Sequence, residues 1–192
     1  MSPRSSKQFE EIREQSRDKI LRAAFELFAK KGYHNTSISQ IAKKAGVAKG
    51  LIYNYFEKKE DLMTGVITHE FDQGDDFLAK IMAEKPGKDR LRMLFELSFT
   101  FITQNLEYQR LMGQLSMQLN DFPDLIDMIQ GRYKGLLPLL TQMLADAGHP
   151  EPEKESIILS AIMDGIGLQY IVLGDALPLE EIKNDIINRY CK

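Results

Sequence analysis

Cysteine is almost absent from this sequence of 192 residues, and tryptophan is absent altogether. The single cysteine, Cys191, cannot form a disulfide within the chain, which fits a reducing compartment. Histidine is scarce as well, and the three histidines at positions 34, 69 and 149 lack the spacing of metal ligands. With no G-x-S-x-G motif and no phosphate-binding glycine loop either, the sequence predicts no metal, no cofactor and no enzymatic activity.

Long hydrophobic runs are missing too. The first 17 residues, MSPRSSKQFEEIREQSR, contain no apolar segment of the kind found in secretory signal peptides. The most apolar stretch, residues 157–174, is interrupted by Asp164 and Gln169, which argues against a transmembrane span. We therefore expect a cytoplasmic protein without a membrane partner.

Alternation of apolar and polar residues, the pattern of a β-strand, does not appear over any useful length, whereas apolar residues recur at helical spacing along the chain. The sequence therefore predicts an all-α fold. The first expected helices cover about residues 16–31, a short segment after Ser37, about two turns from Lys49, and a segment from Lys59 that breaks at Gly74. Beyond a second break at residues 84–88, helices are expected over about residues 88–105, 107–119, 123–147, 153–174 and 179–190.

Negative charge is scarce in the first third of the chain. Residues 1–60 contain 13 lysines and arginines against 7 acidic residues, whereas residues 61–192 contain 12 against 21. A basic segment on an otherwise acidic chain indicates that the first third binds a polyanion. Chance clustering of solvated charges explains the same numbers equally well, so charge alone does not decide between the two.

Residues 37–56 contain the most distinctive pattern of the chain. Residues 37–40, SISQ, have the form of a capping box at the start of a helix, and Gly46 ends that helix. In the short helix that follows, Ile52 and Phe56 share one face, so this helix must be held by its neighbours on that side. Two short helices joined by a tight turn with glycine predict a helix-turn-helix arrangement.

The other face of the second short helix has the chemistry of a DNA reader. The major groove admits one helix, whose side chains contact base edges while the preceding helix holds its back. An asparagine pairs with adenine, a leucine contacts the methyl group of thymine, and a glycine lets the backbone approach the DNA closely. The candidate base-reading residues are Lys49, Gly50, Leu51, Tyr53 and Asn54. The candidate phosphate-binding residues are Thr36, Ser37, Ser39, Tyr55 and Lys59.

Some of these residues have a second interpretation. Leu51, Tyr53 and Tyr55 could pack inside the protein instead of contacting DNA. Near the N-terminus, Arg4 and Lys7 form either a minor-groove arm or part of a disordered tail.

The segment ILRAAFELFAKKGYHNTSISQIAKKAGVAKGLIYNYFEKKEDL carries a longer composite pattern. Its elements A-x-x-L-F-x-x-x-G-Y, T-S-I-x-x-I-A-x-x-A-G-V and K-G-x-I-Y-x-Y-F-x-x-K-E-x-L resemble the DNA-binding domain of the tetracycline-repressor (TetR) family of bacterial regulators. The resemblance implies a DNA-binding domain at residues 14–74, with its helix-turn-helix at residues 37–56. It also implies that residues 75–192 form a helical domain that binds an effector and dimerises.

Residue by residue, the resemblance assigns base reading to the five residues named above and phosphate binding to Thr36, Ser37, Tyr55 and Lys59. Two positions depart from the family pattern, because Ala48 and Lys58 stand where the family often has a hydroxyl that caps the next helix. Losing such a cap costs about 1 kcal/mol.

The expected helix at residues 153–174 is apolar on two sides, and such a helix needs two burial partners. One partner is the core of its own domain, and the other could be the same helix of a second subunit, which Ala161 and Gly165 would allow to approach closely. A central helix of a monomeric domain is the alternative. The candidate interface residues are Ile157, Ala161, Gly165, Leu168, Val172, Ile182 and Ile186.

Methionine and aromatic residues are frequent in residues 75–192, and flexible methionine-rich surroundings suit an adaptable ligand pocket. The same residues also suit an ordinary core. Asp164 and Gln169 lie inside the most apolar helix, where a polar group needs a partner. The candidate effector-pocket residues are Phe99, Met117, Tyr133, Met143, Met163, Asp164 and Gln169.

These patterns and the resemblance predict a homodimeric DNA-binding transcriptional regulator, most simply a repressor that a small organic effector releases from a palindromic operator. The alternative from another class is a helical adaptor whose N-terminal domain docks a protein.

Overall fold

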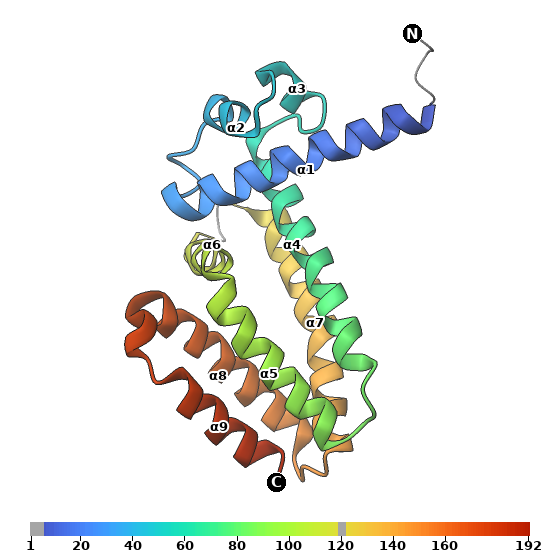
Figure 1. The fold of residues 1–192 in the computed structure, drawn as a ribbon, viewed down its shortest axis with the longest axis vertical. Helices are drawn as coiled ribbons and strands as arrows, with labels where there is room; N and C mark the ends of the chain where they lie inside the picture. The colour runs from blue at the N-terminus through green and yellow to red at the C-terminus, as the bar shows by residue number, and fades with distance from the viewer. Residues whose placement is uncertain (1–5, 119–121) are drawn as a thin grey trace. The chain divides into compact units, whose positions relative to one another are not determined.

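The computed structural model describes residues 6–118 and 122–192, and every regular element in these residues is a helix. Contacts divide the chain into two compact units, with the boundary between Gln73 and Gly74. Figure 1 shows the helices. The α-helices of the first part are α1 (Ser6–Lys31), α2 (Ile38–Ala45), α3 (Lys49–Tyr53) and α4 (Lys59–Met82). The remaining elements are α5 (Lys88–Gln104), α6 (Leu106–Ser116), α7 (Pro123–Asp146), α8 (Pro152–Leu173), the 3-10 helix η2 (Gly174–Ala176) and α9 (Leu179–Tyr190).

The all-α prediction is confirmed, and the expected helices from residue 88 onward agree with α5 to α9 to within a few residues. Three boundaries were wrong. The first helix begins at Ser6, ten residues before the expected start, because its first turns are rich in Glu, Gln and Arg, which favour a helix without any packing. The helix from Lys59 continues through Gly74 to Met82, since one glycine in a helix costs only about 1 kcal/mol. The third boundary concerns α3, described below.

The core of the first unit contains side chains of α1, α2 and α3 and of the first half of α4, since α4 continues beyond Gln73 into the second unit. Ile20 and Phe28 of α1, Ile41 of α2 and Ile52 of α3 are all completely buried. Gly65 lets α4 approach this core, because a Cβ atom at that position would lie 2.8 Å from the Phe56 ring. Helix α2 packs against α1, and α3 packs against α2. This packing fixes the two short helices, since helices of this length are not stable alone.

The second unit has its own core, and α5, α8 and α9 run alongside one another within it (Figure 1). Phe95 and Phe99 of α5, Leu159 of α8 and Ile186 and Ile187 of α9 belong to this core. The connection before α5 is fixed by a buried arginine, Arg90, which donates hydrogen bonds to the carbonyl oxygens of Met82 and Glu84. These bonds satisfy carbonyl groups that would otherwise have no partner at the end of α4.

One segment among the described residues, Pro152–Ala176, is long and apolar enough to cross a membrane, judged by length and composition alone. Core helices of soluble proteins pass the same test, and this segment packs against α5, α6 and α7. Only 17% of the most apolar stretch of this segment is buried, however. Its exposed side therefore presents apolar surface that the chain itself leaves uncovered.

Candidate DNA interface

The start of α2 has the capping box that the sequence predicts. The Ser37 side chain accepts a hydrogen bond from the Gln40 backbone N–H at 3.2 Å, and the Gln40 side chain accepts one from the Ser37 N–H at 2.8 Å. Gly46 ends the helix in the left-handed conformation, with φ 68°. Both ends of α2 are therefore fixed by local bonds. The Ser37 hydroxyl uses one of its two lone pairs in the cap and keeps its proton for another acceptor, and Ser39 is exposed in the same turn.

Thr36 differs from its neighbours. It is almost completely buried, and its hydroxyl lies 2.9 Å from the carbonyl oxygen of Gly32 and 3.2 Å from that of Leu27. The prediction of a phosphate contact through this side chain is not supported, because a buried hydroxyl that already donates to the end of α1 has no proton left for DNA. Thr36 instead joins the end of α1 to the start of α2.

The predicted inward face of α3 is confirmed. Ile52 is completely buried and Phe56 nearly so, whereas Lys49, Gly50 and Asn54 are exposed. Tyr53 is 47% exposed. Leu51 is half-buried, which leaves both of its interpretations open. A Cβ atom at position 50 would meet nothing within 4 Å, so packing within the protein does not require a glycine there.

The helix itself is shorter than the expected two turns. It ends at Tyr53, and the next residues close as a turn in which the N–H groups of Tyr55 and Phe56 both donate to the Ile52 carbonyl oxygen at 3.0 Å. Asn54 therefore lies at the C-terminal end of α3. The missing cap predicted at Ala48 is confirmed, because its side chain makes no capping bond. Buried Ile52, and not the capping of α3, holds this helix in place.

At Lys58, the other departure from the family pattern, a different residue supplies the missing cap of α4. The Lys58 side chain cannot cap α4, but the Asp61 carboxylate accepts a hydrogen bond from the Lys58 backbone N–H at 3.2 Å. The Lys58 ammonium also lies 3.9 Å from that carboxylate. Asp61 therefore fixes the first turn of α4, where a negative charge is favourable.

Lys59 rests on an aromatic ring that sequence reasoning did not connect with it. Its Nζ lies 4.0 Å from the centroid of the Tyr33 ring, which is a cation–π contact. Partial burial there lowers the pKa of Lys59. Burial, and then the hydrogen bond and charge of Glu60, raise the pKa of Tyr33. The sequence did not predict this role of Tyr33, because the Gly-Tyr pair indicates only where α1 ends.

Tyr55 does not point freely toward a partner either. It is half-buried, and its hydroxyl donates a hydrogen bond to the Arg13 carbonyl oxygen of α1 at 3.1 Å. The Arg13 guanidinium lies 5.8 Å from the centroid of the Tyr55 ring, and the Arg17 guanidinium lies 5.8 Å from that of Phe56. The N-terminal half of α1 therefore lies beside Tyr55 and Phe56, the residues that follow α3. The sequence did not predict this contact.

The predicted effector-pocket residues do not form one cavity. Phe99 and Met143 lie in the core of the second unit and Met163 packs against it, whereas Met117 is 84% exposed and Gln169 is exposed. The structure does bring two of the seven together, because the Tyr133 hydroxyl donates to the Asp164 carboxylate at 2.8 Å. Burial and this acceptor raise the pKa of Tyr133 to about 12.

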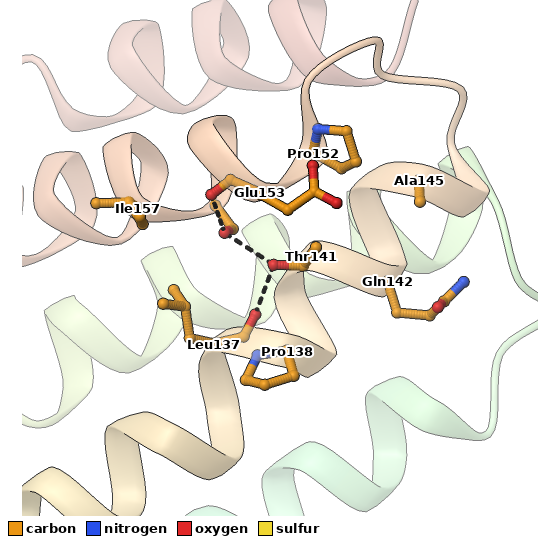
Figure 2. A pocket seen from close by; sticks show the side chains of 9 residues that line it. Leu137, Pro138, Thr141, Gln142, Ala145, Pro152, Glu153 and Ile157 are labelled. Atoms are coloured by element: carbon orange, nitrogen blue, oxygen red, sulfur yellow. Dashed lines mark hydrogen bonds between the residues drawn. The ribbon is translucent and has the colours of Figure 1, made fainter.

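The second unit does contain a groove between α7 and α8, with a volume of about 450 Å³ (Figure 2). At its floor the Thr141 hydroxyl lies 3.0 Å from the Leu137 carbonyl oxygen and 2.9 Å from the hydroxyl of buried Ser156. None of the seven predicted pocket residues lines this groove, although Ile157 of the predicted dimer interface does. No cluster of histidine, cysteine and acidic residues that could hold a metal occurs among the described residues.

The predicted dimer interface is divided. On α8, Ile157 is 58% exposed, Leu168 51% and Val172 80%. Ala161 is exposed and Gly165 half-buried between them. On α9, in contrast, Ile186 is buried in the core of its own unit and Ile182 packs against that core. Because α9 packs against α5, buried Ile186 has little surface left for a second subunit, whereas the interface role of half-buried Ile182 stays a prediction.

Comparison with known proteins decides the family. Residues 20–66 match the model of the bacterial regulatory proteins of the tetR family. The fatty acid metabolism regulator protein of Bacillus subtilis (strain 168) is 30% identical over 139 residues, which are 72% of this chain and 71% of that protein. The chain belongs to the TetR family. This TetR-family chain is thus a DNA-binding transcriptional regulator, and neither an adaptor nor an enzyme.

Two solved structures share the fold of this TetR-family regulator. FadR from Bacillus subtilis in complex with stearoyl-CoA is 22% identical, with a TM-score of 0.71, and covers 91% of this chain and 97% of its own. A structure from Saccharomonospora viridis in complex with choline is also 22% identical, with a TM-score of 0.81, and covers 92% and 95%. The same fold therefore accompanies ligands of very different size and charge.

Proposed function

We propose that residues 14–74 form the DNA-binding domain and that α3 reads the bases of an operator through Lys49, Gly50, Leu51, Tyr53 and Asn54. The observation that carries this proposal is the division of α3 into two faces. Ile52 is buried against the rest of the first unit, while most of the proposed reading residues are exposed. A helix that enters the major groove must pack against its own domain on one face and expose side chains to the base edges on the other. Ser37, Ser39 and Lys59 lie beside α3 in the sequence and are the proposed phosphate contacts.

The proposal separates residues that read bases from residues that only position the protein. Replacing Asn54 by Ala should cost about 1–3 kcal/mol at one base pair of the operator and relax specificity there. Replacing Lys59 by Gln should weaken all duplexes to a similar degree and reduce the slope of log K against log salt by about 0.9. The measurement is selection of bound duplexes from a random pool, followed by titrations at several salt concentrations.

Lys154→Gln is the matched control for the loss of charge, because Lys154 lies in the second unit and is exposed. It should change neither the preferred sequence nor the salt slope. If Asn54→Ala and Lys59→Gln selected the same sequences with equally reduced affinity, the division into reading and positioning residues would be wrong. If the unaltered protein bound no duplex at low salt, the DNA-binding assignment of this unit would itself fail.

We also propose that residues 75–192 form the domain that dimerises and binds an effector. The exposed stripe of Ile157, Ala161, Leu168 and Val172 on α8 supports a homodimer, because an apolar face of this extent marks an interaction surface. Two subunits would place two recognition helices about 34–36 Å apart on a palindromic operator. Such a protein works where its operator DNA is, which is the cytoplasm.

The effector class proposed first is a fatty acyl thioester. The relative with 30% identity is a fatty acid metabolism regulator, and a structure with the same fold was solved with stearoyl-CoA. An effector that binds more tightly to a conformation with low operator affinity shifts the protein toward that conformation and releases the DNA. The regulator would then act as a repressor when its effector is absent.

A further inference from the structure

Two arginines of α1 occupy positions that the helix-turn-helix pattern does not explain. Arg13 and Arg17 are four residues apart, so they lie on one face of α1 and about 6 Å apart along its axis. Both are exposed. Their guanidinium groups lie over the rings of Tyr55 and Phe56, the two residues that directly follow the proposed base-reading residue Asn54.

Neither arginine is neutralised by an acidic side chain in the part of the chain that the structure describes. Glu10 and Glu14 stand three residues before Arg13 and Arg17, where ion pairs along the helix are easily made. Even so, no ion pair of either arginine occurs among the described residues. Both guanidinium groups turn toward the aromatic rings instead. Two like charges at this spacing repel each other slightly in the free protein.

The Tyr55 hydroxyl is already committed to α1. A phenol has one proton to donate, and Tyr55 donates it to the Arg13 carbonyl oxygen. A phosphate oxygen carries no proton, so a hydrogen bond from Tyr55 to DNA would require this bond to break. The same bond fixes the backbone that carries the Arg13 side chain, while the ring supports its guanidinium.

We infer that Arg13 and Arg17 bind backbone phosphates of the operator, and that Tyr55 and Phe56 are positioning residues that hold the two guanidinium groups beside the recognition helix. This inference rests on the proposed DNA-binding function of the first unit. Arginine suits the role, because its planar group stacks on aromatic rings and binds phosphate through two parallel hydrogen bonds. Successive phosphates of one strand are displaced by about 3.4 Å along the duplex axis, so two arginines whose positions on α1 are about 6 Å apart can bind different phosphates.

The first test removes both charges. The double variant Arg13→Gln, Arg17→Gln should reduce the slope of log K against log salt by about 1.8 and leave the preferred operator sequence unchanged. Affinity at moderate salt should fall on the order of 10-fold or more. The control is Lys19→Gln, which removes a positive charge from an exposed residue of the same helix. An equal change in slope per charge for Lys19→Gln would show that only the net charge of α1 acts, and would overturn the inference.

The second test asks whether Tyr55 acts through Arg13. Tyr55→Phe keeps the ring and loses the hydroxyl, whereas Tyr55→Leu loses both. We expect Tyr55→Leu to weaken duplex binding more than Tyr55→Phe, and both effects to shrink in the Arg13→Gln background. If Tyr55→Phe costs as much affinity in that background as in the unaltered protein, the hydroxyl itself contacts the DNA and the inference is wrong.

Two measurements distinguish a direct role of the arginines in DNA binding from misfolding and from a failure of the proposed function. Unfolding temperatures of each variant, measured without DNA, show whether a loss of affinity is a loss of folded protein. If the unaltered protein binds its operator with a steep salt dependence while the arginine variants match it, the proposed function stands and only the role of the arginines fails. If the unaltered protein binds no duplex, both fail together.

Discussion

At the scale of single residues, the phosphate-binding set predicted from sequence turns out to mix two kinds of residue. Ser37, Ser39 and Lys59 present polar groups at the surface or at its edge. The hydroxyl groups of Thr36 and Tyr55, in contrast, donate hydrogen bonds to carbonyl oxygens of α1 and of the turn that follows it. The residue type suits a phosphate contact in all five cases, so the sequence alone could not separate them. Only the partner of each hydroxyl does so.

Lys59 illustrates how a neighbouring ring can set the position of a charge. We expect Tyr33→Leu to weaken binding of every duplex several-fold, because the ammonium loses the ring that holds it and a cation–π contact is worth about 0.5–2 kcal/mol. Tyr33→Phe keeps the ring and should bind like the unaltered protein. The measurement is duplex affinity for both variants, in the unaltered and in the Lys59→Gln background.

Tyr33 is buried, so Tyr33→Leu also costs stability, and the titrations must be made well below its unfolding temperature. The Lys59→Gln background provides the control, since Tyr33→Leu should have little further effect on affinity when the ammonium is already gone. An equal loss of affinity in both backgrounds would mean that Tyr33 acts through the fold of the first unit and not through Lys59.

At the scale of elements, the sequence predicted most where periodicity and capping are local. Residues 37–40 specify the start of α2 by bonds within four residues, and the structure has those bonds. It predicted less where tertiary packing decides. Whether Ile186 faces a second subunit or its own core depends on how α9 meets α5, and the apolar stripe is the same in both cases. The length of α1 was missed for a related reason, because its first turns are polar and carry no packing signal.

Helix α8 is the element whose exposed face most needs a partner. Leu168→Glu should shift the protein toward the monomer in sedimentation experiments, because a charge would be placed in the proposed interface, where burial of an unpaired carboxylate is strongly unfavourable. Helical content by circular dichroism should stay unchanged, since Leu168 is half exposed in the single chain.

Asn184→Glu is the matched control, as it adds the same charge to an exposed position of α9. It should leave the association constant unchanged. A dimer of undiminished strength in Leu168→Glu would move the interface away from this stripe, and a monomeric unaltered protein at micromolar concentration would remove the dimer from the proposed function.

At the scale of the whole molecule, effector binding and operator binding must be coupled in both directions. If a fatty acyl thioester is the effector, stearoyl-CoA should raise the unfolding temperature and lower operator affinity, whereas choline at equal concentration should do neither. At a concentration 100 times its Kd, a ligand of the folded state adds about 2.7 kcal/mol of stability.

Measuring stearoyl-CoA binding with and without operator DNA tests this coupling a second time. By linkage, saturating operator DNA must weaken stearoyl-CoA binding by the same factor as stearoyl-CoA weakens operator binding. Thermal stabilisation without any loss of operator affinity would show a ligand that does not regulate. No effect of stearoyl-CoA on either quantity would exclude this effector class while leaving the DNA-binding function intact.

The open space around Gly50 has a consequence for how such a regulator diversifies. Positions 49, 50, 53 and 54 are exposed and are not part of the buried core of the first unit, so substitutions there change stability very little. Screening variants for folding or expression would therefore not detect damage at these four positions. For the same reason, a duplicated gene could acquire a new operator through one or two substitutions on α3, without any compensating change elsewhere in the protein.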